Sequence, residues 1–464
     1  MILFGIIIVL ILGFSIVNAI SKKFSILEKI GLSFLLGIGF ETFFMFILDV
    51  LTIKFNLFIL IAISISLIIL LNIKNINKFG LQIQKLKAIK TKAKKINYKS
   101  INFIWLFFFL IICILLYGSA AKSLYWPTFA YDNVAGYDLM GKVMASEGSI
   151  NNSLFEIDNA PILGSARRCI YPPLVSGSFA FAYLCNLSTS KLISSLFFIF
   201  FILSFYASLR IVTNRINSII ATFLMIITPE MFAFSSLSTT NIPTAIYGSL
   251  AIIYLYLWLN KREKRYLIIS SILMAFNVWT RSDAVVFNIT GFAVLFMDAI
   301  IKKQWKALFI YSIISFPLFF AWNLFIKYNI IIDQNVFIDK LFWDADKCSK
   351  ILVWVKNLIT NTSLYGIAFY ALFIIIIINI KYLIKDKSSL LLILFFVSWI
   401  LYTLVFYQMD NSKMDPLNNM MRASYRRGLF VFIPIIWFYI PSSKVINSLF
   451  EKYENFLFSG RDKS

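Results

Sequence analysis

The sequence contains no histidine and few charged residues. The lack of histidine in all 464 residues excludes histidine–zinc sites, Ser–His–Asp triads and histidine proton relays. Charged residues make up 14% of the chain, whereas a soluble protein needs about a quarter to cover its surface. Hydrophobic residues make up 60%. The composition predicts an all-α polytopic membrane protein and excludes a cytosolic enzyme, a secreted domain and a coiled coil.

Cysteine is also scarce, with four residues and no CxxC spacing. Cys113 lies within an apolar run and is expected in the core. Cys169 and Cys348 fall in loops that we place outside the cytoplasm. A disulfide between them stays open, because the sequence alone cannot establish the pairing.

The formal net charge of +22 could indicate nucleic acid, but its distribution argues against such a partner. Much of the excess lysine and arginine lies in short segments between apolar runs. Positive charge in that position anchors cytoplasmic loops of membrane proteins. We therefore expect membrane lipids, and no nucleic acid, around this chain.

Apolar runs close to the length of a spanning helix recur along the whole sequence. A span needs roughly 20 apolar residues. The runs predict a bundle of about thirteen transmembrane helices. They lie near residues 1–20, 30–50, 55–73, 101–121, 191–209, 213–228, 242–259, 266–280, 284–301, 306–326, 364–380, 388–407 and 428–441.

The basic loops set the predicted orientation. Segment 74–99 carries nine lysines and no acid, and the connections 261–265, 302–306 and 381–387 are also basic. Placing these in the cytoplasm puts the acid-rich loops on the outer side, namely 122–175, 229–241, 328–362 and 408–427. Residues 174–187 are apolar but too short to span, and they predict a short interfacial or partly inserted helix.

We find no separate soluble domain, so the prediction is a single transmembrane domain, 1–464. Residues 1–100 supply the first spans and the lysine-rich cytoplasmic loop 74–99. Residues 101–441 form the core with the extracytoplasmic loop 122–175, and 442–464 form a cytoplasmic tail.

The long loop 122–175 holds the densest group of polar residues. Amphipathic spacing through Val134, Leu139, Val143 and Met144 predicts a helix lying in the membrane interface. Asp132 precedes this stretch and should lie close to the outer surface, where it could act as a general base on an acceptor hydroxyl. The alternative is that Asp132 caps the helix.

Arginine is unusually abundant on the predicted outer side. The residues are Arg167, Arg168, Arg281, Arg422, Arg426 and Arg427. Guanidinium groups bind phosphate bidentately, so a phosphate at the outer leaflet would explain them. The alternatives are pairing with nearby external acids or imperfect orientation at the span ends.

The triplet Asp344-Ala-Asp346 has a spacing that can chelate a divalent ion. Such triplets are common by chance, and Lys347 would compete for the charge. It is a weak alternative metal site.

Four motifs in order resemble those of GT-C superfamily glycosyltransferases, of the aminoarabinose-transferase and protein-mannosyltransferase type. The first loop opens Tyr131-Asp132-Asn133 and continues to Tyr171-Pro-Pro-Leu174. Thr240-Asn-Ile-Pro-Thr244 and Thr280-Arg-Ser-Asp283 follow, and Ser424-Tyr-Arg-Arg-Gly428 precedes the last span. The resemblance covers roughly residues 101–441.

The resemblance implies a GT-C-like bundle with interfacial helices in the first external loop. It implies inverting transfer of a sugar, hexosyl or pentosyl, from a polyprenyl-phosphate carrier to an extracytoplasmic glycan, lipid or protein acceptor. Asp132 stands where the family has its catalytic base, with Asp138 as the fallback. The family's second acid is here Asn133, and its loop Asp is here Asn241, which puts the acid–base arrangement in doubt. Donor-phosphate ligands would be Arg168, Tyr171, Arg281, Arg422, Arg426 and Arg427.

Many such enzymes work without metal, because cationic side chains neutralise the leaving phosphate. We therefore expect no cofactor, with a divalent cation at Asp344 and Asp346 as the alternative. The competing functions are a transporter or flippase of a lipid-linked saccharide and a polymerase or ligase of lipid-linked oligosaccharides. A transporter should have repeated halves and midplane charges, and neither is evident. The expected location is the plasma or inner membrane, in the biosynthesis of envelope glycans, with the active site facing away from the cytoplasm.

Overall fold

The computed structural model describes residues 2–90, 102–128, 133–155, 171–329, 341–409 and 416–459. Helices are the only regular secondary structure in this part of the chain. The first half contains α1 (Ile2–Ile20), α2 (Ile26–Val50), α3 (Leu57–Lys90), α4 (Phe103–Tyr125), α5 (Asp138–Glu147), α6 (Leu174–Leu184), α7 (Lys191–Leu209), α8 (Arg215–Ile226) and α9 (Pro229–Phe234). The all-α prediction is confirmed for the described residues.

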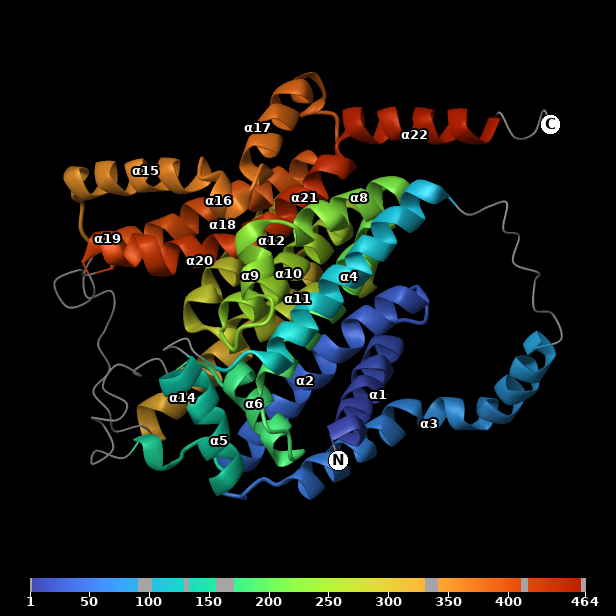
Figure 1. The fold of residues 1–464 in the computed structure, drawn as a ribbon, viewed down its shortest axis with the longest axis vertical. Coiled ribbons are helices and arrows are strands. Elements are labelled where there is room, and N and C mark those ends of the chain that lie inside the picture. Colours follow the sequence, from blue (N-terminus) through green and yellow to red (C-terminus); the bar gives the residue numbers. More distant parts are fainter. Residues whose placement is uncertain are drawn as a thin grey trace.

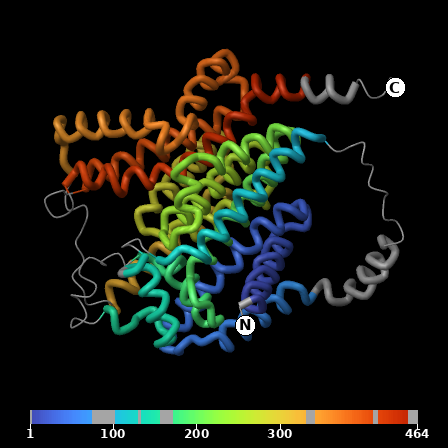
Figure 2. The backbone as a smooth tube through the Cα atoms, viewed as in Figure 1, coloured from blue at the N-terminus to red at the C-terminus, as the bar shows by residue number. Residues whose placement is uncertain are grey.

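The second half forms the rest of the bundle (Figure 1). Its helices are α10 (Asn241–Lys261), α11 (Lys264–Thr280), α12 (Val285–Lys302), α13 (Trp305–Ser315), α14 (Pro317–Asn329), α15 (Ala345–Ile359), α16 (Thr362–Tyr365), α17 (Ala368–Ile378), α18 (Ser389–Gln408), α19 (Leu417–Met420), α20 (Arg426–Gly428), α21 (Phe432–Ser442) and α22 (Lys444–Ser459). Figure 2 shows α22 leaving the bundle after α21.

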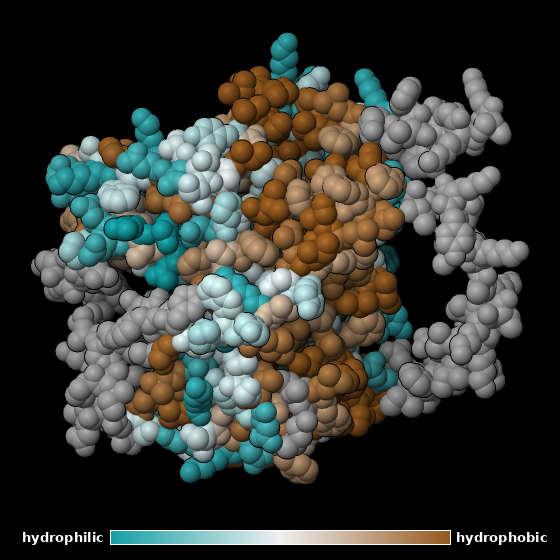
Figure 3. Space-filling view, viewed as in Figure 1, coloured by the Kyte–Doolittle hydropathy of each residue, from teal (hydrophilic) through white to brown (hydrophobic). Residues whose placement is uncertain are grey.

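Eight helices of the described residues are long and apolar enough to cross a membrane, or nine if the bent pair 417–442 and 444–452 forms one span. Apolar side chains gather over much of the face in Figure 3, and hydrophilic ones gather over α15 and α19. The chain is therefore a multi-pass membrane protein. Several predicted spans, including α8 and α17, are shorter than this test requires, so the count of about thirteen stays a prediction.

Helix α10 forms the centre of the bundle. Every residue of its apolar stretch is buried, and it packs against α7, α11, α18 and α21. A helix that is hydrophobic on all sides is typical of the interior of a large membrane bundle. Helix α11 runs back along α10, so the start of α10 and the end of α11 lie at the same end of the bundle. The hydroxyls of Thr244 and Thr280 lie 2.7 Å apart there.

Small residues allow α1 and α2 to pack closely. A Cβ added at Gly13 would lie 1.8 Å from the carbonyl oxygen of Ser33, and one at Gly37 would lie 2.0 Å from that of Val9. Close approach at small residues is the usual basis of helix association in lipid.

Helix α4 is mostly exposed. The expectation that Cys113 lies in the core is wrong, because this residue faces outward on α4.

The first external loop contains the predicted helix α5, which packs against the short helix α6. Met140, Gly141 and Met144 form the buried side of α5, whereas Val134 is exposed and Val143 is partly exposed. Residues 174–187 do form a short helix, α6, which is buried against α2 and α5. Placement of α5 and α6 at the membrane interface stays a prediction.

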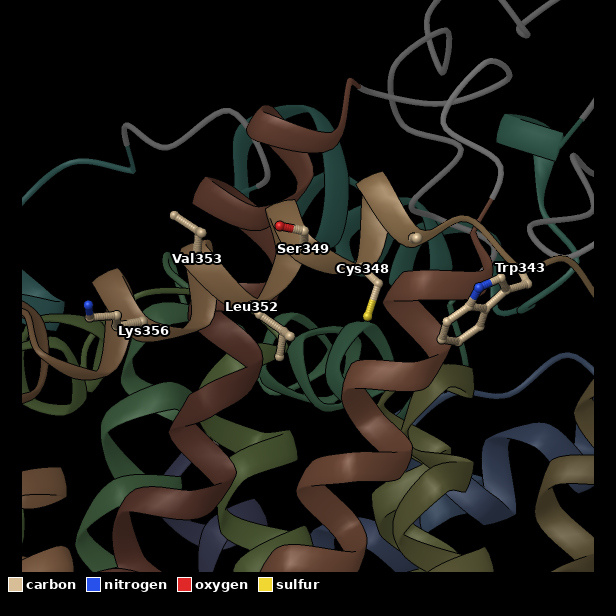
Figure 4. A pocket seen from close by; sticks show the side chains of 7 residues that line it. Trp343, Cys348, Ser349, Leu352, Val353 and Lys356 are labelled. Atoms are coloured by element: carbon tan, nitrogen blue, oxygen red, sulfur yellow. The ribbon is translucent and has the colours of Figure 1, made fainter.

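Helix α15 lies across the end of α18. Figure 4 shows Cys348 and Leu352 pointing from α15 toward the helices below it, whereas Val353 points away. Lys347 donates to the carbonyl oxygen of Met409 at 2.6 Å, which ties α15 to the segment that follows α18. Cys169 lies outside the described residues, so the open disulfide with Cys348 stays open.

Candidate active site

Two arginines from distant parts of the sequence line one pocket at the end of α10. Arg281 ends α11, and Arg427 lies in the turn of helix before α21. Asn241, Asp283 and Tyr402 of α18 complete the polar wall of the pocket. The bundle therefore gathers the second, third and fourth sequence motifs at one place, because α10, α11 and α21 all end or begin there.

Arg281 is held in place by an acid two residues away. Its Nε and Nη2 donate to the two carboxylate oxygens of Asp283 at 2.9 and 2.7 Å. The side chains are 14% and 19% exposed, so this is a largely buried bidentate pair. Burial lowers the pKa of Arg281, but pairing with Asp283 outweighs it and leaves the pKa above its ordinary value. Arg281 is thus a fixed cation.

The pair with Asp283 leaves part of the Arg281 guanidinium unused. A guanidinium has five N–H donors in a fixed fork, and Asp283 takes one from Nε and one from Nη2. Three donors, including both on Nη1, remain for another partner. The carboxylate sets the orientation, and the opposite edge of the fork can bind an anion.

Aromatic rings of the first loop and of the residues that follow it pack beside Arg281. The guanidinium carbon of Arg281 lies 5.3 Å from the ring centre of Tyr171, and Tyr171 stacks on Tyr137 with centroids 6.0 Å apart. Burial raises the pKa of Tyr137, whose hydroxyl bonds Thr240 at 3.3 Å. The rings link η2 (Asn133–Tyr137) to the arginine pocket.

Arg427 is positioned by its own backbone. Its Nε donates to the carbonyl oxygen of Ala423 at 2.8 Å, within the π-helical turn η8 (Met421–Tyr425) and α20. Tyr425 is fixed by Trp399 and Thr403 of α18, at 2.9 and 2.8 Å from its hydroxyl. The segment that carries Arg427 is therefore clamped to α18.

The other two arginines of this motif point elsewhere. Arg426 faces Glu230 of α9, with Nε 3.7 Å from a carboxylate oxygen, and its carbonyl accepts a bond from Tyr365. Arg422 is exposed. The structure thus brings Arg281 and Arg427 together beside Tyr171, and it does not bring Arg422 or Arg426 into that pocket.

Asp138 follows η2 as the first residue of α5. Its carboxylate accepts hydrogen bonds from Tyr183 and Ser190, both at 2.5 Å, and lies 3.4 Å from the Lys142 ammonium. It lines an open pocket beside α4 and α7 and does not line the arginine pocket. Asp132 and Arg168 lie outside the described residues, so their roles remain predictions.

The Asp344 and Asp346 side chains have ordinary structural partners. Asp344 caps α15 by accepting from the Lys347 backbone N–H at 3.1 Å, and Asp346 pairs with Lys350 at 2.6 Å. Within the described ranges, no cluster of three or more metal-ligating acids or cysteines occurs. The two carboxylates are therefore engaged by a helix cap and by an ion pair.

Sequence reasoning missed Tyr402 and Phe287, which line the arginine pocket. Tyr402 lies in the apolar span 388–407, and Phe287 lies in the span 284–301. Aromatic residues are so numerous in this chain that nothing in the sequence singled these two out.

Residues 186–324 match the family model described as dolichyl-phosphate-mannose-protein mannosyltransferase, a GT-C family. The resemblance to GT-C glycosyltransferases is confirmed. The match runs from just before α7 into α14 and contains Asn241, Arg281 and Asp283. It supports a membrane glycosyltransferase of the GT-C type. No curated protein and no solved structure matches the chain.

Proposed function

We propose that this GT-C-type protein transfers a sugar from a polyprenyl-phosphate carrier to an acceptor on the extracytoplasmic side of the plasma or inner membrane. The observation that carries the proposal is the pocket in which Arg281 and Arg427 converge beside Tyr171. Two cations in one small, largely buried pocket suit a group with two negative oxygens, such as a phosphodiester that becomes a phosphate monoester on leaving.

The bond changes follow from inverting transfer. The acceptor hydroxyl attacks the anomeric carbon as the bond between that carbon and the phosphate oxygen breaks. The polyprenyl phosphate leaves with the bonding electrons, and the base takes the acceptor proton. Arg281 and Arg427 stabilise the negative charge that develops on the phosphate. This charge is larger in the transition state than in the bound donor, so the two guanidinium groups lower the barrier.

The proposed base is Asp132, and Asp138 is the fallback. Asp138 already accepts hydrogen bonds from Tyr183 and Ser190 and pairs with Lys142. These partners favour a structural role for its carboxylate over the role of general base. Asp132 directly precedes Asn133, whose buried side chain lines a crevice next to the pocket of Asp138 and Lys191. This adjacency supports Asp132 as the base.

We also propose that the reaction needs no metal, because the two guanidinium groups can supply the positive charge that a divalent ion would otherwise provide. Arg168 of the first loop would add to this set. Arg422 and Arg426 fit the donor site less well, since one is exposed and the other faces Glu230.

The test is sugar transfer from radiolabelled polyprenyl-phosphate donors by the purified full chain in nanodiscs. We expect Asp132→Asn to lower kcat by about 10³-fold or more with donor binding retained, as loss of a general base requires. Arg281→Gln and Arg427→Gln should each weaken donor binding by about tenfold or more. Lys350→Gln, on the exposed face of α15, is the matched control.

Equal transfer by wild type and Asp132→Asn would move the base to Asp138 or elsewhere, and Asp138→Asn separates these cases. Transport of an intact lipid-linked saccharide across the vesicle membrane, without any transfer, would contradict the enzyme and favour a flippase.

A further inference from the structure

A second cationic site is formed by residues that do not line the arginine pocket. An open pocket of about 310 Å³ is bordered by Trp126, Asp138, Lys142 and Lys191. A narrow crevice adjoins it, and Trp126 and Lys191 line both. The crevice also borders Lys122 and Asn133, so three lysines surround the two hollows.

Lys191 is the unusual member of this group. It is only 5% exposed, yet among the described residues its ammonium has no hydrogen bond or ion pair. The ammonium itself is not among the fully buried atoms without a partner, so water in the two hollows reaches it, and an anion bound there would take the place of that water. Lys191 is also the first residue of the nineteen-residue helix α7, whose N-terminal end attracts negative charge.

Two further polar atoms of the crevice lack partners within the described part of the chain. The Oδ1 atom of Asn133 and the hydroxyl of Ser236 are buried without a hydrogen bond, and the two side chains are 1% and 2% exposed. Buried polar groups are almost always satisfied in native structures. The crevice therefore has an unfilled capacity for hydrogen bonds from hydroxyl groups, in addition to a cation.

Asp138 is the one acid among the described residues that line this site. It accepts from the hydroxyls of Tyr183 and Ser190, lies 3.4 Å from Lys142 and also attracts Lys191. One carboxylate beside three lysines leaves the site with a net positive charge. Lys122 in turn lies 5.6 Å from the ring centre of Trp126 and 3.4 Å from the Ala233 carbonyl oxygen.

Exposed aromatic rings border the open pocket. Tyr125 is 90% exposed and Trp126 is 54% exposed, at the end of α4. Flat aromatic surfaces with adjacent hydroxyl and cationic groups suit a sugar ring that carries an anion. The two sites meet at neighbouring residues, because Tyr137 joins the aromatic stack on Arg281 while Asp138 borders this pocket.

We propose that this second site, formed around Lys191, binds the acceptor and selects a saccharide that carries a phosphate group. The inference rests on the proposed function, since it assigns the pocket to the acceptor of the transfer. Lys191 binds the phosphate and Trp126 packs on the ring. The crevice, with a volume of about 10 Å³, admits a single sugar hydroxyl that bonds Asn133 and Ser236. The predicted base Asp132 precedes Asn133 in the chain, as an acceptor site requires.

The test measures binding of glucose 1-phosphate to the full chain by saturation-transfer-difference NMR, in nanodiscs of neutral phosphatidylcholine. We expect saturable binding to wild type, to Lys350→Gln and to the double variant Arg281→Gln/Arg427→Gln, which lacks the arginine pocket. Lys191→Gln should weaken it about tenfold or more, the effect of losing a charge-assisted hydrogen bond. Lys191→Arg should retain binding, Lys142→Gln should weaken it less, and glucose should bind more weakly than glucose 1-phosphate.

Three results would overturn the proposal. If Lys191→Gln binds glucose 1-phosphate as well as wild type does, Lys191 does not form the binding site. If binding is lost only in the double variant Arg281→Gln/Arg427→Gln, the phosphate binds in the arginine pocket instead. Loss of the Lys191-dependent signal in phosphatidylglycerol nanodiscs would assign the site to a lipid headgroup. None of these measurements requires transfer, so a failure of the proposed enzyme activity would be seen separately, in the donor assay.

Discussion

Replacing Asp283 with asparagine tests whether this carboxylate orients Arg281 or competes with the donor phosphate. Asparagine keeps the size of the side chain and one acceptor oxygen but removes the charge. Breaking a buried ion pair by removing one partner costs about 3–5 kcal/mol, because the other charge stays buried. The two side chains here are 14% and 19% exposed and asparagine can still accept one bond, so we expect a loss of about 2 kcal/mol.

The donor should partly repair this loss. In Asp283→Asn the Arg281 guanidinium lacks its counter-charge, and a bound phosphate would supply one. Polyprenyl phosphate should therefore stabilise Asp283→Asn at least as much as it stabilises wild type. In Arg281→Gln, by contrast, the ligand should give little stabilisation, because a ligand stabilises only through its affinity for the folded state.

The assay is reversible unfolding in mixed detergent and sodium dodecyl sulfate micelles, with and without polyprenyl phosphate. The double variant Arg281→Gln/Asp283→Asn completes the cycle and should be more stable than Asp283→Asn alone, because no unpaired charge remains. An Asp283→Asn protein that is as stable as wild type would refute the buried pair as described. One that folds but loses polyprenyl-phosphate binding as fully as Arg281→Gln would refute the division of the guanidinium between carboxylate and phosphate.

Two further predictions concern residues around the arginine pocket. A Cβ at Gly428 would lie 1.7 Å from the Tyr402 hydroxyl, so Gly428→Ala should displace this buried ring, cost about 1–3 kcal/mol as overpacking does, and raise the donor KM. Gly118→Ala on α4, where nothing lies within 4 Å of the new atom, is the matched control and should be neutral or slightly stabilising; equal stability and KM for both variants would contradict the contact. Burial raises the pKa of Glu230 despite the attraction of Arg426 and Arg427. Its contribution to stability is therefore full below the ordinary value of 4.5 and is lost as pH rises through the raised pKa. Glu230→Gln should flatten melting temperature against pH over that window, and an unchanged slope would show that another group causes it.

The helices and the general nature of the protein were predictable because they depend on local patterns. Long apolar runs determine the spans whatever surrounds them, and the structure has helices at every predicted run that it describes, among them α2, α10 and α18. The helix in the first loop was predictable for the same reason, since Leu139, Val143 and Met144 of the amphipathic pattern lie within α5, although Val134 lies before it and is exposed.

The partition of the arginines was not predictable, because it depends on how distant helices meet. Arg426 and Arg427 are neighbours in the sequence, yet one faces Glu230 of α9 and the other lines the pocket with Arg281. Consecutive residues of a helix point about 100° apart, and the clamping of Tyr425 by α18 holds the following helix α20, which carries both arginines. A motif can supply the cations, but only the packing of α9 and α18 decides which of them is left for a ligand.

The site around Lys191 could not be predicted from the sequence for the same reason. In the sequence it is one lysine at the start of an apolar run, which is the ordinary position of a residue that marks the membrane boundary. Burial beside Asn133 and Ser236 gives it a different meaning, because a boundary lysine should extend into water or toward lipid headgroups. If donor and acceptor occupy the two pockets, adjacent residues of the chain link them, since Tyr137 stacks on Tyr171 beside Arg281 and Asp138 lines the pocket of Lys191. Both ligands would then border the first loop, in which the sequence places the proposed base.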